Sequence, residues 1–213
     1  MPAAADAALR RLLDVTLAGV LLVALWPLLA VLALLVRATS PGPGVFRQTR
    51  IGRHGRPFVL LKLRTMRTDA PGPVITSGAD PRITRLGAWL RRTKLDELPQ
   101  LWNVLRGDMS LVGPRPEVPH YVALYTAAQR AVLLVRPGLT DPASLAWADE
   151  AATLATFADP HRAYADVVMP QKLELSLTYL ERRTVWSDLA VVMRTVAHVA
   201  RSHLPVRLRE RPT

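Results

Sequence analysis

Hydrophobic residues are distributed unevenly along the chain, and the longest apolar segment lies near its N-terminus. Residues 15–36 read VTLAGVLLVALWPLLAVLALLV, about 22 residues without a charge, which is enough to cross the hydrocarbon core of a bilayer as a helix. The segment is longer than the apolar region of a cleaved signal peptide, and no evident small-residue cleavage site follows it. The alternative, a buried helix of a soluble domain, would need protein on every side of the helix. The pattern therefore predicts a membrane helix.

Pro27 divides this segment into two arms of roughly 10–12 residues, each too short to span a bilayer alone. Because proline removes a backbone hydrogen bond and clashes with the preceding turn, it kinks or breaks the helix. Two topologies remain: a kinked helix that crosses the membrane, and a re-entrant helix that turns at Pro27 and leaves on the side it entered. Basic residues flank both ends: Arg10, Arg11, Arg37, Arg47 and Arg50. Since positive residues favour the cytoplasmic side, this pattern favours the re-entrant form.

A Pro/Gly-rich sequence, RATSPGPG at residues 37–44, ends the apolar helix and marks a boundary. We therefore divide the chain into a membrane helix with its flanks, residues 1–40, and a globular domain, residues 41–213. At the start of this domain, the β-prone sequences VFRQTRIG and PFVLLKLRTM surround a turn at residues 53–56. This arrangement predicts a β-hairpin.

The rest of the domain shows mostly helical periodicity. Four apolar residues of the segment 84–105 recur at the spacing of one buried helical stripe: Leu95, Leu98, Trp102 and Leu105. A separate polar stripe contains Asp96, Gln100 and Asn103. Further helices are predicted in residues 119–135, 172–179 and 188–200. The expected fold is mainly α with a small β-hairpin, in which a re-entrant helix broken at Pro27 precedes a compact domain with amphipathic helices at the membrane interface.

The composition adds a strong positive charge to this picture. The chain has 28 Lys and Arg against 17 Asp and Glu, a formal net charge of +11, which suggests an anionic partner such as a nucleic acid, an anionic membrane or a phosphorylated substrate. The absence of cysteine excludes disulfides, iron–sulfur clusters and thiolate zinc sites, and the histidines have no metal-ligand spacing. No basic strip interleaved with aromatic residues is available to stack bases, so we expect no nucleic-acid partner.

Two adjacent carboxylates, Asp96 and Glu97, are the first candidates for chemistry. Neighbouring residues on a helix point about 100° apart, so one acid could face a substrate phosphorus while the other holds a cation. Pro99 makes the backbone irregular beside them, and functional sites often lie at such irregularities. The alternative is that both are solvated acids at the start of a helix, where the helix dipole favours them.

Basic side chains provide the second group of candidates. Arg115 lies between two prolines, which restrict its backbone, and a guanidinium can bind phosphate oxygens in a bidentate manner. Lys62 and Arg64 alternate with leucines, so they are expected to share one face of a strand and to form a phosphate clamp. The alternatives are an ordinary exposed loop arginine and a solvated basic strand face.

Together these segments resemble the bacterial sugar transferase family, the monotopic phosphoglycosyl transferases that start glycan assembly on a polyprenyl lipid. The resemblance extends from Leu9 to about Thr195, and the long motif that contains both acids and Arg115 is highly specific. The matching segments are KLRTM at 62–66, DPRITRLG at 80–87, residues 91–117, RPG at 136–138, and the pattern Lys172, Tyr179, Asp188.

The resemblance implies a glycosyl-1-phosphate transferase, on the cytoplasmic face of the bacterial inner membrane, with a monotopic re-entrant helix. Such an enzyme moves a sugar-1-phosphate from a UDP-sugar to polyprenyl (undecaprenyl) phosphate, releases UMP, and so begins the synthesis of a polysaccharide such as an exopolysaccharide. Its partners would be these two substrates and membrane lipids, with a homodimer as its candidate assembly.

The resemblance also implies roles for individual residues. Asp96 would form a covalent phosphosugar intermediate, and Glu97 would hold Mg²⁺, which prefers hard oxygen ligands. The residues predicted to bind the substrate phosphates or the nucleotide are Arg115, Lys62, Arg64, Arg91, Arg92, Gln100 and Asn103.

This sequence departs from the family pattern in two places. Trp26 precedes Pro27 where family members often have serine, which bears on the geometry of the bend. Residues 136–140 read RPGLT and continue as DPASLAW at 141–147, where many members read Thr-Gly-x-x-Gln. This region bears on sugar or nucleotide recognition. Two other functions compete with the transferase: a non-enzymatic scaffold for anionic lipid or nucleic acid, and a membrane diphosphate hydrolase that uses water as the acceptor.

Overall fold

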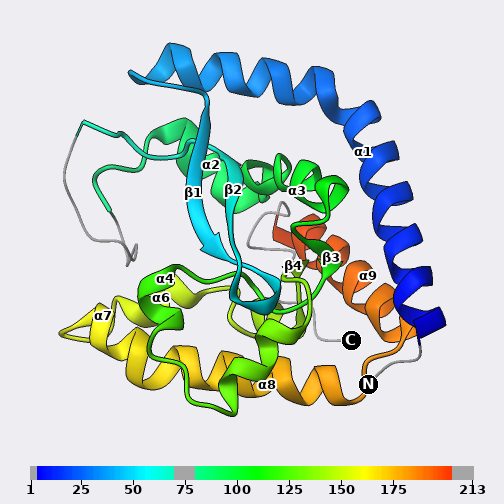
Figure 1. Cartoon of the computed structure of the whole chain (residues 1–213). Helices are drawn as coiled ribbons and strands as arrows, with labels where there is room; N and C mark the ends of the chain where they lie inside the picture. Colours follow the sequence, from blue (N-terminus) through cyan, green and yellow to red (C-terminus); the bar gives the residue numbers. More distant parts are fainter. Residues whose placement is uncertain (1–3, 70–79, 203–213) are drawn as a thin grey trace.

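The computed structural model describes residues 4–69 and 80–202, and its architecture is mainly helical, with a small antiparallel hairpin, as the sequence predicted. The longest element is helix α1 (Ala4–Thr39), which continues through Pro27. Figure 1 shows that α1 is bent, with its two arms along adjacent sides of the globular part. A proline within a helix accounts for such a bend, because it removes a backbone hydrogen bond.

Only a narrow inner face of α1 is covered by the rest of the chain. Ala18 packs in an apolar cluster with Leu101 of helix α3, and Leu32 and Val36 pack in another with Leu90 of helix α2. In the apolar window of α1, 11% of the residues are buried. This low fraction contradicts the buried helix of a soluble domain, and the helix is long and apolar enough to cross a membrane.

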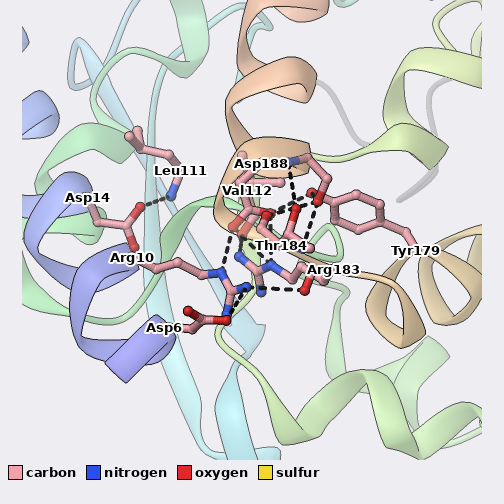
Figure 2. Close-up of polar contacts among 10 residues, drawn as sticks. Asp6, Arg10, Asp14, Leu111, Val112, Tyr179, Arg183, Thr184 and Asp188 are labelled. Carbon is pink, nitrogen blue, oxygen red and sulfur yellow. Dashed lines mark hydrogen bonds and ion pairs between the residues drawn. The ribbon is translucent and has the colours of Figure 1, made fainter. Parts of the chain in front are cut away.

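The N-terminal arm of α1 is attached to the globular part by a network of polar contacts (Figure 2). Arg10 forms an ion pair with Asp188 at 3.0 Å and donates to the carbonyl oxygen of Arg183 at 3.2 Å. Asp14 accepts a hydrogen bond from the amide of Leu111 at 2.9 Å. Since Arg10 and Asp14 are both buried, these contacts fix the first turns of α1.

The C-terminal arm of α1 is attached to the same domain by Arg64. Its guanidinium donates to the carbonyl oxygens of Ser40 at 2.7 Å and Val36 at 3.3 Å, and also to that of Pro41. A cation at this position satisfies carbonyls that a helix end leaves without partners and interacts favourably with the helix dipole. Arg64 is therefore a capping residue of α1 in this fold.

The predicted β-hairpin is confirmed. Strands β1 (Val45–Ile51) and β2 (Pro57–Leu63) pair antiparallel around the short helix η1 (Arg53–Gly55). Because β2 ends at Leu63, Arg64 lies beyond the strand. The expectation that Lys62 and Arg64 share one strand face is therefore wrong.

The predicted helix over residues 84–105 is divided into three elements: α2 (Arg85–Thr93), the 3₁₀ turn η2 (Leu95–Glu97) and α3 (Gln100–Arg106). Lys94 separates the first two in a left-handed conformation, with φ of 58°. The 3₁₀ turn η2 winds more tightly than an α-helix and so changes the helical phase before α3 begins. The expected buried stripe is therefore wrong at Trp102, which is 51% exposed.

The C-terminal half contains a small parallel sheet that the pattern did not predict. Strands β3 (Ser110–Val112) and β4 (Gly138–Thr140) pair side by side, and Gly113 and Gly138 allow the close approach just beyond β3. A Cβ atom built on Gly138 would lie 2.1 Å from the amide nitrogen of Gly113. Only glycine fits such a contact.

Short helices surround this sheet, and two longer ones follow. The continuous helix predicted over residues 119–135 is wrong, because the structure has only α4 (Pro119–Val122) and the 3₁₀ helix η3 (Gln129–Leu134) there. The helices predicted at 172–179 and 188–200 are confirmed as parts of α8 (Met169–Glu181) and α9 (Val185–Ser202). The remaining elements are α5 (Pro142–Ala146), α6 (Glu150–Leu154), α7 (Pro160–Ala163) and the π-helix η4 (Tyr164–Val168).

Candidate active site

A cleft of about 450 Å³ brings the two adjacent acids together with most of the predicted cations. Asp96 and Glu97 line it, and the basic side chains around them are Arg50, Lys62, Arg91, Arg92, Lys94 and Arg115. A larger groove of about 790 Å³ lies between the C-terminal arm of α1 and β1, but its lining contains no acid. The titratable groups therefore point to the smaller cleft as the site of chemistry.

Asp96 is a buried carboxylate at the edge of this cleft. The left-handed Lys94 and the 3₁₀ turn that follows place its side chain there, where it is 4% exposed. Its Oδ1 atom has no hydrogen-bond partner within residues 4–69 and 80–202. Burial, and then the negative charge of Glu97, raise the pKa of Asp96 above its usual value. An unpartnered carboxylate oxygen in a cationic cleft is available to a ligand.

Glu97 points to a different target, as expected for neighbouring acids. Arg115 holds it in a two-point contact, with Nη2 to Oε1 at 2.6 Å and Nη1 to Oε2 at 3.3 Å. Lys62 lies 3.7 Å from the same Oε1 atom. Burial opposes ionisation of Glu97, but Arg115 and then Lys62 outweigh it and hold the pKa of Glu97 well below its usual range. Glu97 is therefore a fully ionised anchor for two cations.

Backbone contacts fix the loop that carries Arg115. The amide of Gly113 donates to the carbonyl oxygen of Thr140 at 3.0 Å, and the amide of Gly138 donates to that of Pro114 at 2.9 Å. Just after this loop, Glu117 accepts hydrogen bonds from Arg50, at 3.1 Å, and from the hydroxyl of Tyr164. Two segments that match the family pattern, residues 113–117 and 136–138, thus contact each other and hold Arg115 in place.

Arg91 and Arg92, at the C-terminal end of α2, line the cleft on the side of Asp96. Arg91 donates to Oγ1 of Thr65 at 2.8 Å and to the sulfur of Met66 at 2.9 Å. Burial lowers the pKa of Arg91, and the charge of Asp96 opposes this shift. Arg91 therefore links helix α2 to the segment KLRTM (residues 62–66) beside the two acids.

Three predicted substrate-binding residues do not line the cleft. Arg64 caps α1, as described above. Asn103 is fully buried and links α3 to β2: its amide donates to the carbonyl oxygen of Val59 at 2.8 Å, and its Oδ1 accepts from the amide of Leu61 at 3.1 Å. Gln100 is 1% exposed in α3, next to the acids in sequence but outside the cleft lining.

Several cleft residues were not among the candidates chosen from the sequence. They are Arg50, Lys94, Glu117, Tyr121, Ser144, Trp147, Glu150, Tyr164 and Lys172. Lys94 and Glu117 belong to the motif that contains the acids, so its boundaries could have indicated them. Arg50 was read as a flanking charge of the membrane segment, although its guanidinium is paired with Glu117. Lys172 belongs to a segment that matches the family pattern, so the resemblance could have indicated it. Spacing gave no signal for the others.

The oxygen donors at this site fit a Mg²⁺ ion that is completed by substrate phosphates. Within residues 4–69 and 80–202, no three His, Asp or Glu side chains form a metal-binding cluster. Mg²⁺, however, often takes one or two carboxylates together with phosphates and water. The carboxylate of Glu97 offers one such ligand, and it would share its charge between the ion and Arg115.

This chain is similar to known proteins over most of its length. The model of the bacterial sugar transferase family matches residues 5–202. The UDP-glucose:undecaprenyl-phosphate glucose-1-phosphate transferase of Caulobacter vibrioides is 41% identical over 203 residues, which cover 88% of this chain and 68% of that protein. The enzyme of the same description from Escherichia coli is 39% identical over 194 residues, or 88% of this chain and 39% of its own length.

This chain is also similar to an enzyme that is named for a sugar other than glucose. The UDP-N-acetylgalactosamine-undecaprenyl-phosphate N-acetylgalactosaminephosphotransferase of Aeromonas hydrophila is 32% identical over 201 residues, which cover 92% of this chain and 44% of that protein. The chain thus spans less than half the length of this relative and of the Escherichia coli one. With nearly every described residue covered by the family model, the chain belongs to the bacterial sugar transferase family.

Proposed function

We propose that this protein is a phosphoglycosyl transferase that moves a sugar-1-phosphate from a UDP-sugar to polyprenyl phosphate and releases UMP. The named relatives transfer glucose-1-phosphate or N-acetylgalactosamine phosphate to undecaprenyl phosphate, which supports the general reaction for this chain. The observation that carries the proposal is the buried carboxylate of Asp96, which lines a cleft surrounded by cations and has one oxygen without a hydrogen-bond partner in the described residues. Diphosphate cleavage needs a placed nucleophile and neutralised phosphoryl oxygens.

The proposed reaction has two displacement steps at the phosphorus that carries the sugar. First, a carboxylate oxygen of Asp96 bonds to this phosphorus, and the bond to the bridging oxygen breaks, so that UMP leaves with the bridging oxygen. Next, a phosphate oxygen of the polyprenyl phosphate bonds to the same phosphorus, and Asp96 leaves as a free carboxylate. The product is a polyprenyl diphosphate sugar.

The surrounding residues would bind and orient the phosphates. Arg115, pre-positioned by its loop, and Lys62 lie beside Glu97, where they can neutralise phosphoryl oxygens as charge develops. Arg91 and Arg92 would bind the remaining phosphate oxygens of the donor. Lys62, Lys94 and Arg91 also favour ionised Asp96, because they oppose the pKa rise that burial and Glu97 cause. A bound Mg²⁺ would supply further charge neutralisation on the phosphoryl oxygens.

Glu97→Gln is expected to raise the Mg²⁺ concentration needed for half-maximal activity by about 10-fold or more, because an amide oxygen is a weaker ligand than a carboxylate. A magnesium titration of UMP release measures this effect. Glu174→Gln on the exposed side of α8 is the matched control. An unchanged magnesium requirement would remove Glu97 from the metal site.

We further propose that α1 is re-entrant, so that the domain lies on one membrane face. Its two arms are attached to the same domain, one through Arg10 and the other through Arg64. A helix that crossed the bilayer could not keep both contacts. Exposed apolar residues of α9 would rest on the same surface: Trp186, Leu189, Met193 and Val196. We assign this surface to the cytoplasmic face of the inner membrane, where the lipid acceptor would reach Asp96. The homodimer stays a prediction.

The topology can be tested with single cysteines, since the chain has none. Ala7→Cys and Ala38→Cys place a thiol at an exposed position near each end of α1. Both are expected to resist a membrane-impermeant maleimide in intact cells and to react in inverted membrane vesicles. Labelling of one position in intact cells and of the other only in inverted vesicles would show a crossing helix.

The activity itself is tested by UMP release from a panel of UDP-sugars, with Mg²⁺ and polyprenyl phosphate present. We expect UMP and a lipid-linked sugar diphosphate to appear in equal amounts with at least one donor. Free sugar phosphate formed without the lipid would indicate a hydrolase instead. Binding to anionic lipid without any turnover across the panel would favour a scaffold.

A further inference from the structure

The wall of the cleft formed by α5 and α6 differs in chemistry from the wall that carries the acids. Ser144, Trp147 and Glu150 come from this segment, and Lys172 and Tyr164 complete it from α8 and η4. Around Asp96 the side chains are mostly cations suited to phosphates. Here a hydroxyl, an indole, a carboxylate and an ammonium group are gathered, a mixture that matches a neutral polar ligand with several hydroxyls.

Ser144 provides the observation that points to a ligand. Its side-chain Oγ is buried and has no hydrogen-bond partner anywhere in the described part of the chain. Unpaired buried polar atoms are uncommon, because burying a polar group without a hydrogen bond lowers the stability of the fold. Asp96 Oδ1 is a second such atom in the lining of the same cleft. Each wall therefore contains one lining residue with a buried oxygen that lacks a hydrogen-bond partner in the described part of the chain.

The backbone around Ser144 is held firmly. Asp141, 1% exposed, accepts a hydrogen bond from the amide of Ser144 at 2.8 Å and another from the hydroxyl of Ser176 at 2.8 Å. These bonds cap α5 and tie it to α8. A hydroxyl on a backbone fixed in this way lies at a defined place in the cleft wall, as selection among ligands requires.

Glu150 and Lys172 present a second fixed group. Lys172 donates to Oε2 of Glu150, and its ammonium lies 5.6 Å from the centre of the Tyr164 ring. Glu150 also adds to the negative field that raises the pKa of Arg115, behind the larger contribution of Glu97. Arg115 thus lies within the field of both walls. A donor with its phosphates at Arg115 would have its neighbouring sugar or its nucleoside within reach of Glu150.

We propose that Ser144, Trp147 and the Glu150–Lys172 pair form the subsite for the sugar of the donor, and that they select the sugar by its hydroxyl or amide groups. This inference rests on the proposed transferase function. A sugar hydroxyl both donates and accepts, so it can bond to Ser144 and to either member of the ion pair. The indole of Trp147 offers an apolar face for the ring of the sugar. Uracil is the competing occupant, and the test separates the two.

The test compares UDP-glucose, UDP-galactose, UDP-N-acetylglucosamine and UDP-N-acetylgalactosamine as donors for the wild type and for Ser144→Ala and Glu150→Gln. We expect kcat/KM for the best wild-type donor to fall about 10–100-fold in each variant, and the preference among the four to narrow. Inhibition by UDP, which lacks the transferred sugar, is expected to stay within about 2-fold of the wild type. Thr178→Ala and Glu174→Gln, at exposed positions of α8, are the matched controls and should behave as the wild type.

Three results would overturn the subsite. If the variants keep the wild-type kcat/KM and preference, the sugar lies elsewhere. If UDP inhibition weakens in step with the loss of donor use, the segment binds the nucleoside. If the thermal unfolding midpoint of a variant falls and donor preference is unchanged, the residue has a structural role. A wild type that uses none of the four donors, whatever UDP binding shows, would instead contradict the transferase function itself.

Discussion

Asp96→Asn is expected to lower turnover by about 10⁴-fold or more, because an amide cannot form the acyl phosphate on which both displacement steps depend. The fold should survive, since the substitution keeps the shape of a buried side chain and removes its charge beside Glu97. UMP release with the best UDP-sugar measures the rate, and the thermal unfolding midpoint confirms the fold.

Asp149→Asn is the matched control for this experiment, because Asp149 is exposed at the start of α6. It should retain the wild-type rate. If Asp96→Asn also turned over at the wild-type rate, Asp96 would not be the nucleophile. The other candidate carboxylate, Glu97, is already held by Arg115 and Lys62.

The second large effect is expected at Arg115. Arg115→Lys keeps one positive charge but loses the planar two-point contact with Glu97 and with phosphate oxygens. We expect kcat to fall about 10²–10³-fold, the range typical of losing one positioned donor to a developing oxyanion. Steady-state kinetics with varied donor separates kcat from KM.

Arg130→Lys, at an exposed position after α4, is the control for this change and should leave kcat unaltered. A loss confined to KM, with kcat preserved, would show that Arg115 binds the donor in the ground state without added stabilisation of the transition state. Equal kinetics in Arg115→Lys and the wild type would contradict its role altogether.

Local sequence pattern predicted those parts of the site that depend on nearby residues. Asp96, Glu97, Lys62 and Arg115, chosen from adjacent acids, a β-hairpin strand and a proline-restricted loop, line one cleft, and their roles there stay predictions. Arg91 and Arg92, which the family resemblance implied, line it as well. The hairpin and the two C-terminal helices also follow from simple periodicity. In these elements, local preference and the final packing agree.

Long-range packing decided the parts that pattern could not predict. The left-handed Lys94 and the 3₁₀ turn after it divide a segment whose periodicity is helical, and Trp102 lies at the surface. Asn103 was expected in the site because it follows the acids by helical spacing, yet its side chain serves as a link between α3 and β2. The pairing of β3 with β4 depends on the contact of Gly113 with Gly138, which are far apart in sequence.

Arg64 illustrates the same limit for charged residues. From the sequence, Arg64 and Lys62 were equivalent cations two positions apart. In the structure, β2 ends between them, so that Lys62 faces Glu97 and Arg64 binds the carbonyls at the end of α1. A buried cation needs hydrogen-bond acceptors, and the carbonyl oxygens at the end of α1 satisfy Arg64, so its guanidinium is not directed to the cleft. The position at which a strand ends can therefore decide the role of a charged residue as much as the alternation of side chains along that strand does.

Mass spectrometry of the protein after a brief reaction with the UDP-sugar that it uses, without polyprenyl phosphate and with acid quenching, tests the central claim most directly. The account predicts that the intact mass rises by one sugar phosphate, that the modified peptide carries this group on Asp96, and that added lipid acceptor removes it. A protein that releases UMP at full rate in the presence of acceptor, yet never shows this adduct or shows it on another residue, would contradict the account.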